Sequence, residues 1–208
     1  MYLRDCGFSQ RGGAKRKFVL KYFVLTLCLL SQPCFPSDWQ SQTADSKLEF
    51  SVNFEQQPIS GLFEQFLVVY KTAPDTTPLQ LTVTVDVASA NMSNSDINEA
   101  IQESDWFDAS YYPQAKFTSS VIEKDRNGSF VANGTLQLKG VKQPVIVPFT
   151  WKPVVGQSGA MLMTGQVVLN RLDFLIGTGD WASDDEIGLS VTVDFAVTFI
   201  TDSVEVDS

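Results

Sequence analysis

The sequence contains no histidine, and its three cysteines, Cys6, Cys28 and Cys34, all lie within the first 34 residues. Without histidine the chain cannot form a Ser-His-Asp triad, and the usual general base and the commonest ligand of zinc, iron and copper are absent. Without cysteine after residue 34, the rest of the chain has neither a thiolate zinc site nor an internal disulfide framework. We therefore expect no catalysis, no metal and no cofactor, and a domain that depends on its hydrophobic core.

Basic residues are scarce after the N-terminal segment. Residues 1–37 hold six of the 15 lysines and arginines but one of the 24 acidic residues, so the remaining segment carries a net charge of −14. A chain this acidic is repelled by nucleic acid and by anionic lipid headgroups. These two classes of partner are therefore excluded.

The N-terminal segment has the layout of a secretory signal peptide. Arg11 and three further basic residues precede the apolar run from Tyr22 to Leu30, and a polar stretch with prolines follows. A membrane anchor is the alternative, but a spanning helix needs about 20 apolar residues, and Lys21 and Pro33 bracket fewer. We predict that residues 1–37 are a signal peptide, with no stable membrane insertion after its removal.

The remaining 171 residues have the size of one domain, which buries about 70% of its unfolded surface. No repeat or linker divides them. We assign residues 38–200 to one domain and residues 201–208 to an acidic C-terminal tail.

Alternation of apolar and polar residues predicts β-strands along most of this domain. The Asn127-Gly128 pair predicts a tight hairpin turn between two of them. Short turns and about eight strands favour a closed barrel or a sandwich, and we favour an all-β, eight-stranded antiparallel barrel, which can enclose one small ligand. The most regular expected strands cover residues 48–54, 79–87, 115–124, 129–139, 145–151, 160–169 and 188–200.

Two local patterns interrupt the strands. Asp96-Ile97-Asn98-Glu99 predicts one short helix to about Gln102. The Asp96 side chain would cap its N-terminus by accepting from free N–H groups of the first turn, and the Glu99 side chain would accept from the backbone N–H of the cap residue. Pro148 lacks an N–H donor, which suggests an edge or irregular strand position. An edge strand near Val145 to Trp151 could pair with the same strand of a second copy, so a homodimer is one alternative.

Three stretches, in order along the chain, resemble motifs of the YceI-like family of bacterial periplasmic proteins. A fourth, SGLFEQF at residues 60–66, is similar to an early motif of that family, and the likeness covers roughly residues 44–200. The three stretches are DWFDASYYPQAKFTSS (105–120), GTLQLKGVKQPVIVPFTW (134–151) and NRLDFLIGTGDW (170–181).

The resemblance implies an extended, lipocalin-like, eight-stranded antiparallel barrel in the periplasm. Its long tunnel is expected to bind a polyisoprenoid, such as a prenyl quinone, or another long amphiphile, and no catalytic mechanism is implied. The sequence departs from the family pattern where Asn53 or Phe54 replaces a frequent histidine, where residues 97–99 replace basic residues, and where Val68 replaces a glycine. These departures concern the headgroup that the ligand would carry.

Eleven apolar side chains in or beside the expected strands are candidates to line the tunnel. Ordinary core packing explains any one of them, whereas the set is what an apolar ligand would need. They are Phe50, Phe54, Phe63, Phe66, Phe107, Phe117, Leu136, Phe149, Phe174, Trp181 and Phe195.

Asn170, Arg171 and Asp173 are the candidate polar mouth of the barrel. Either Arg171 and a carboxylate form a structural latch, because a guanidinium can bind a carboxylate bidentately, or Arg171 contacts a carbonyl or phosphate of the ligand. We favour the latch.

Two acidic groups offer weaker alternatives. The loop with Asp180, Asp184, Asp185 and Glu186 lacks the ligand spacing and the glycine of a calcium loop, so we interpret it as solvated charge. A carboxylate pair such as Asp105 with Asp108 is compatible in principle with glycoside hydrolysis, but the sequence does not place the two groups across a sugar, and we do not favour this alternative.

We interpret the chain as a periplasmic binding or carrier protein that holds a polyisoprenoid or another long amphiphile. The alternative is a structural or stress-response interaction module with a packed barrel and no small-molecule ligand. A continuous apolar tunnel would favour the first, and an exposed apolar patch the second.

Overall fold

The computed structural model describes residues 37–200. The expected signal peptide, apart from Ser37, and the expected acidic tail lie outside the described residues. Ten of the eleven strands are longer than two residues, and α1 (Ser95–Ala100) is the one α-helix in the described range. The strands are β1 (Ser37–Ser41), β2 (Lys47–Phe54), β3 (Gln57–Phe63), β4 (Phe66–Thr72), β5 (Pro78–Asp86), β6 (Ala90–Asn91), β7 (Gln114–Lys124), β8 (Phe130–Leu138), β9 (Val141–Pro153), β10 (Ala160–Asn170) and β11 (Ser190–Ile200). The 3₁₀ turns are η1 (Thr43–Asp45), η2 (Val87–Ser89), η3 (Arg171–Phe174) and η4 (Gly179–Trp181).

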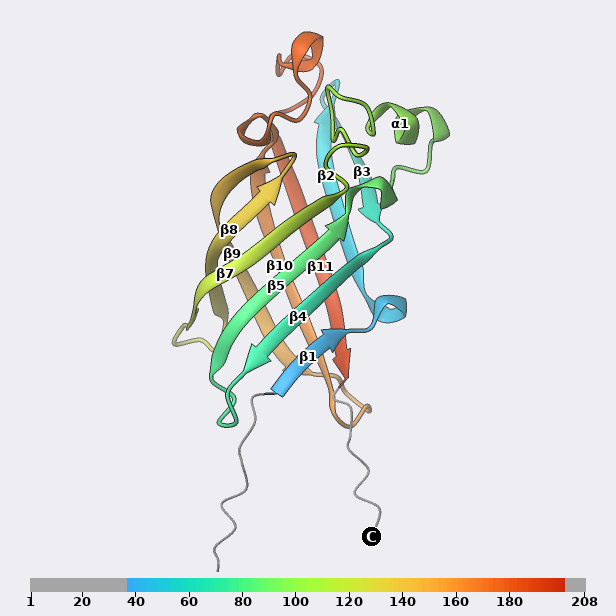
Figure 1. Cartoon of the computed structure of the whole chain (residues 1–208). Helices are drawn as coiled ribbons and strands as arrows, with labels where there is room; N and C mark the ends of the chain where they lie inside the picture. Colours follow the sequence, from blue (N-terminus) through green and yellow to red (C-terminus); the bar gives the residue numbers. More distant parts are fainter. Residues whose placement is uncertain (1–36, 201–208) are drawn as a thin grey trace, which may run out of the picture. The chain divides into compact units, whose positions relative to one another are not determined.

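The strands form a closed antiparallel barrel, as expected (Figure 1). Eight strand positions follow one another around the ring in the order β1, β4, β5, β7, β8, β9, β10 and β11, and β1 closes it by pairing with β11 through Gln40 and Ser41. After η1 the chain resumes as β2 along the same edge of β11, and β2 folds back as β3. The prediction of an eight-stranded β-barrel with one short helix is confirmed.

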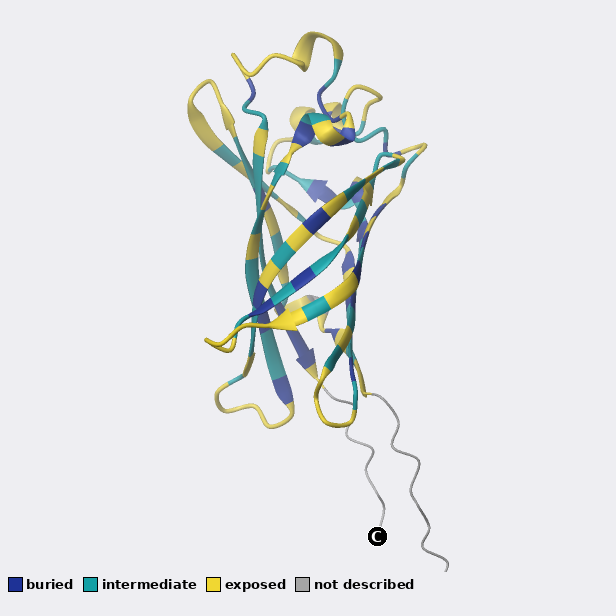
Figure 2. Cartoon of the chain, turned by 90° about the vertical axis from the view of Figure 1, so that its left-hand side faces the viewer, coloured by how far each residue is buried: buried dark blue, intermediate teal, exposed yellow. Residues whose placement is uncertain are grey.

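Each wall strand turns alternate side chains inward. In β4, Phe66, Val68 and Tyr70 are buried while Leu67 between them is exposed, and alternating bands of burial run along the strands in Figure 2. The sequence did not reveal β4, because Phe66 to Val69 are all apolar and the polar half of the alternation is missing.

Aromatic rings fill the lower end of the barrel, where β1 begins and β11 ends (Figure 1). The ring of Tyr70 lies 4.7 Å from that of Trp151 and 5.9 Å from that of Phe149, and Trp151 lies 5.0 Å from Phe199, measured between centroids. Burial raises the pKa of the Tyr70 phenol to about 12, so it stays neutral at physiological pH. These rings close the lower end.

Arg171 organises the loop between β10 and β11 at the opposite, upper end. Its side chain is 3% exposed, and its five N–H groups serve six backbone carbonyl oxygens at 2.6 to 3.1 Å. Burial lowers the pKa of this guanidinium, an effect that Asp184 partly offsets. The carbonyls belong to Ile176, Gly177, Trp181, Ser183, Ile187 and Gly188.

Two local predictions are wrong. Asn94, not Asp96, caps α1, because its side-chain oxygen accepts from the N–H groups of Asp96 and Ile97, and the helix ends at Ala100 rather than Gln102.

The β7–β8 connection is a five-residue loop, 125–129, in which Asp125 accepts from two backbone N–H groups. Gly128 alone in this loop has positive φ, so the tight Asn127-Gly128 turn does not form.

Gly165 allows β9, β10 and β11 to pack closely. A Cβ atom there would collide with the carbonyl oxygen of Pro148 and with the ring of Phe195, whereas at Gly188 the nearest atom would be 3.5 Å away. We expect Gly165→Ala to lower the free energy of unfolding by about 2 kcal/mol through overpacking, and Gly188→Ala to change it little. Urea denaturation followed by tryptophan fluorescence measures both; equal effects would contradict the close approach.

Replacing Arg171 tests the loop scaffold. Arg171→Lys keeps the charge but has three N–H donors for six carbonyls, so we expect a loss of about 3 kcal/mol in the free energy of unfolding. Arg126→Lys, at an exposed position in the β7–β8 loop, is the matched control. If both variants unfold at the same urea concentration, the carbonyl cluster does not stabilise the fold.

Candidate ligand-binding site

A mouth cavity of about 440 Å³ lies beneath α1 at the upper end. Its walls are the β2–β3 hairpin, the helix with the segments on either side of it, the β10–β11 loop and the start of β11. Asp96 and Arg171 are its charged lining residues, and the others are apolar: Phe50, Val52, Phe54, Ile59, Phe63, Met92, Ile97, Ala100, Ile101, Trp106, Phe107, Ile176, Trp181, Ile187, Val191 and Val193.

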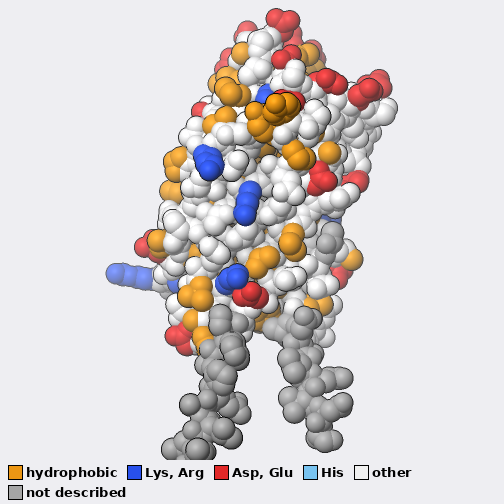
Figure 3. All heavy atoms as spheres, viewed as in Figure 1, with side chains coloured by type: hydrophobic (Ala, Val, Ile, Leu, Met, Phe, Trp, Pro, Cys, Tyr) orange, Lys and Arg blue, Asp and Glu red, His pale blue; other side chains and the backbone are white. Residues whose placement is uncertain are grey.

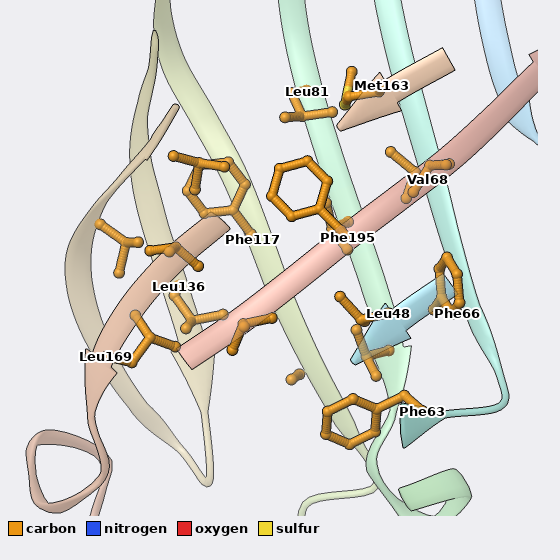
Figure 4. A pocket seen from close by; sticks show the side chains of 18 residues that line it. Leu48, Phe63, Phe66, Val68, Leu81, Phe117, Leu136, Met163, Leu169 and Phe195 are labelled. Carbon is orange, nitrogen blue, oxygen red and sulfur yellow. The ribbon is translucent and has the colours of Figure 1, made fainter. Parts of the chain in front are cut away.

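An inner cavity of about 150 Å³ lies within the barrel, and all of its lining side chains are apolar (Figure 4). Figure 4 shows Phe117, Leu136 and Phe195 converging on it from different strands. The remaining lining residues are Leu48, Phe63, Phe66, Val68, Leu81, Val83, Val85, Ala115, Val145, Val147, Met163, Val167, Leu169, Val193 and Val197.

The two cavities adjoin. Phe63 and Val193 line both, so these two side chains form the junction between the mouth and the inner cavity. Met163, which is 1% exposed and pairs with Trp151, lines the lower part of the inner cavity, and the aromatic rings of the lower end lie below it. We call the mouth cavity, the junction and the inner cavity together the tunnel.

Nine of the eleven apolar candidates line the tunnel. Trp181 stands at the rim, 38% exposed, with its ring 5.9 Å from that of Trp106. Phe149 and Phe174 line neither cavity: Phe149 stacks on Phe130 near the lower end, and Phe174 lies beside β9 and β10.

The candidates predicted from the sequence include six of the eighteen residues that line the mouth cavity, so twelve were missed. Val52 lies two residues from the candidates Phe50 and Phe54, and Val193 two residues from Phe195. The alternation of each strand therefore places these valines on the inward face and could have identified them. Met92, Ile97 and Ile101 come from a loop and the helix, where no period of two applies. Their place in the wall follows from the fold.

The three candidate polar residues do not form an open polar mouth. Asn170 accepts from the Leu172 N–H and thereby caps η3, and the Asp173 side chain is exposed. Arg171 lines the mouth cavity, but its N–H groups bind backbone carbonyls rather than the Asp173 carboxylate. Arg171 therefore holds the β10–β11 loop together through backbone carbonyls, not through a carboxylate. Its N–H groups are used in these bonds, so the mouth offers a ligand few polar contacts.

The acidic side chains stay outside the tunnel, apart from Asp96. The loop with Asp184 and Asp185 is exposed at the upper end, where acidic groups gather in Figure 3. Asp105 and Asp108 lie near Lys139, whose ammonium donates to the carbonyls of Ser104 and Leu175. Within residues 37–200, no three acidic, histidine or cysteine side chains come together as metal ligands. In the same range no helix has both the length and the hydrophobicity to cross a membrane.

Comparisons with known proteins agree with this architecture. The sequence profile of the YceI-like domain matches residues 39–199. A UPF0312 protein of Photorhabdus laumondii is 26% identical over 117 residues, which cover 54% of this chain and 60% of that protein. A UPF0312 protein of Shewanella baltica is 34% identical over 71 residues, 34% of this chain and 37% of that protein. The matched region thus spans less than two thirds of the length of these relatives.

Solved structures show the same fold. BcnA of Burkholderia cenocepacia is 28% identical, with a TM-score of 0.70 over 76% of this chain and 98% of that one. A polyisoprenoid binding domain from Saccharophagus degradans is 15% identical, with a TM-score of 0.61 over 80% of this chain and 99% of that one, which is a likeness of fold alone. Because the profile match extends from β1 to the end of β11, the chain belongs to the YceI-like domain family.

Proposed function

We propose that this protein binds and carries a polyisoprenoid, or a similarly long amphiphile, in its tunnel and does so in the periplasm after export. The observation that carries the proposal is the adjoining pair of apolar cavities closed at the lower end. A packed-barrel interaction module would not need this internal space. The Saccharophagus structure of the same fold, described as a polyisoprenoid binding domain, supports the same ligand class.

Burial of the ligand's apolar chain would supply most of the binding free energy. A chain that loses about 400 Å² of apolar surface gains about 10 kcal/mol, at about 25 cal/mol per Å², against an association cost of at least about 4 kcal/mol. No charged contact is required for this gain. Affinity would therefore follow the length of the apolar chain until the tunnel is full.

The distribution of polar groups sets the ligand's orientation. The inner cavity has no polar side chain, and an unpaired polar group placed there would cost a few kcal/mol, about 1 to 3 by protein mutational data. The headgroup would therefore remain at the mouth, near Asp96 and the exposed rim at Trp181. In the bound state the chain would extend from the mouth past Phe63 and Val193 into the inner cavity.

Narrowing the junction should weaken binding. Val193→Phe places a ring where both cavities meet, and we expect at least about tenfold weaker binding of a fluorophore carried on a farnesyl chain, equivalent to about 1.4 kcal/mol. Val155→Phe, at a position that is 99% exposed, is the control and should bind as the unaltered protein does. Fluorescence titration gives both affinities, and equal values would place the probe elsewhere.

The ligand itself can be identified by mass spectrometry. Protein purified from the periplasm of its own host should release an apolar, chain-like molecule into organic solvent, and the Val193→Phe variant should release less of it per mole. If the extract of unaltered protein contains no such molecule and the protein binds no farnesyl probe, the carrier function is wrong.

A further inference from the structure

The barrel wall is hydrogen-bonded along only part of the boundary between β9 and β10. Residues Phe149 to Pro153 of β9 pair with Met161 to Gly165 of β10, and the pairing stops there. Above this point Val141 to Pro148 pair with β8 alone, and Gln166 to Asn170 pair with β11 alone. We call the boundary between 141–148 and 166–170 the seam.

Two prolines explain why the strands separate. Pro144 and Pro148 have no N–H, and because N–H groups alternate between the two edges of a strand, residues four apart lie on the same edge. The carbonyl oxygen of Pro148 lies against Gly165 of β10, so this edge faces β10. The edge therefore lacks two of the donors that a continuous ladder would need. The same deficit disfavours pairing with a strand of a second copy.

The seam lies directly outside the inner cavity. An external groove of about 250 Å³ follows it. Val145, Val167 and Leu169 line both this groove and the inner cavity. A single layer of aliphatic side chains thus separates the cavity from the outside, with the buried Phe174 at the groove's upper end.

The described contacts that close the seam are weak compared with those that close the mouth. At the upper end of the seam, the Gln143 side-chain amide donates to the carbonyl of Asp173 in η3 at 3.1 Å, in an exposed position. Around the mouth, Arg171 makes six hydrogen bonds and Lys139 two more. Segments with few buried contacts and exposed hydrogen bonds open first in local fluctuations.

We propose that the seam is a lateral portal through which the apolar chain of the ligand enters and leaves the inner cavity. This inference rests on the proposed carrier function. A flexible chain would pass sideways between Val145 and Val167 while the mouth loop stays in place, so it need not thread from the mouth through the junction. The seam then controls the rate of exchange, and the cavities control the affinity.

A covalent staple across the seam tests the proposal. If the β9–β10 register continued, Ile146 would lie opposite Val168, and both side chains are exposed, at 62% and 59%. The described residues contain no cysteine, so Ile146→Cys with Val168→Cys, in a chain whose three native cysteines are serine, gives one reactive pair. A short bismaleimide should slow release of the farnesyl probe by at least about tenfold while the equilibrium affinity stays within about twofold.

The matched control places the same cross-link on the paired part of the same strands. Lys152 and Leu162 are register partners, and Lys152→Cys with Leu162→Cys should leave the release rate unchanged when cross-linked. Equal release rates for the two stapled proteins, both with normal affinity, would overturn the portal and leave the carrier function standing. Loss of probe binding in the unmodified protein would overturn both.

A second variant keeps the test independent of the staple's effect on folding. Gln143→Ala removes the hydrogen bond to Asp173 and should accelerate probe release by about threefold without altering the urea midpoint. Gln137→Ala, an exposed glutamine on β8, is its control. An unchanged rate for Gln143→Ala, measured by stopped-flow displacement, counts against the portal.

Discussion

The buried guanidinium of Arg171 is the interaction on which the upper end of the barrel depends. The loop between β10 and β11 buries Phe174, Ile176 and Ile187, and its turns leave backbone carbonyls pointing inward. One side chain satisfies six of these carbonyls, and in return they solvate a charge that is 3% exposed. The loop can then stand over the barrel as the wall of a cavity and need not collapse into it.

The interior is divided between regions that are filled and regions that are not. At the lower end the rings of Tyr70, Phe149, Trp151 and Phe199 contact one another and leave no passage. In the middle, aliphatic side chains and the rings of Phe66, Phe117 and Phe195 face a space that they do not fill. The rings at the lower end contact one another, whereas those around the inner cavity leave space between them. The size of the inward side chains therefore sets the length of any chain that can be held.

Retention and exchange place opposite demands on such a container. A ring of continuous hydrogen-bonded strands would hold an apolar molecule but offer it no lateral exit, since each strand is hydrogen-bonded to both neighbours. Two prolines on one edge of β9 relax this condition locally and leave the other pairings of the ring intact. In the proposed mechanism, affinity and exchange rate depend on different residues, so substitutions should change one without the other.

The sequence by itself determined the strands with clean alternation, such as β5 and β11, and the inward face of each, because a period of two is a local property of an extended chain. Together with the resemblance to the YceI-like family it also predicted the closed eight-stranded barrel. It flagged Pro148 as irregular, for the local reason that proline donates no hydrogen bond. Only the tertiary structure decided that the irregularity is a seam beside a cavity, that Phe149 fills the lower end, and that Phe195 lines the tunnel. An inward phenylalanine has the same sequence pattern whether it meets another ring or empty space, and what it meets is set by strands distant along the chain.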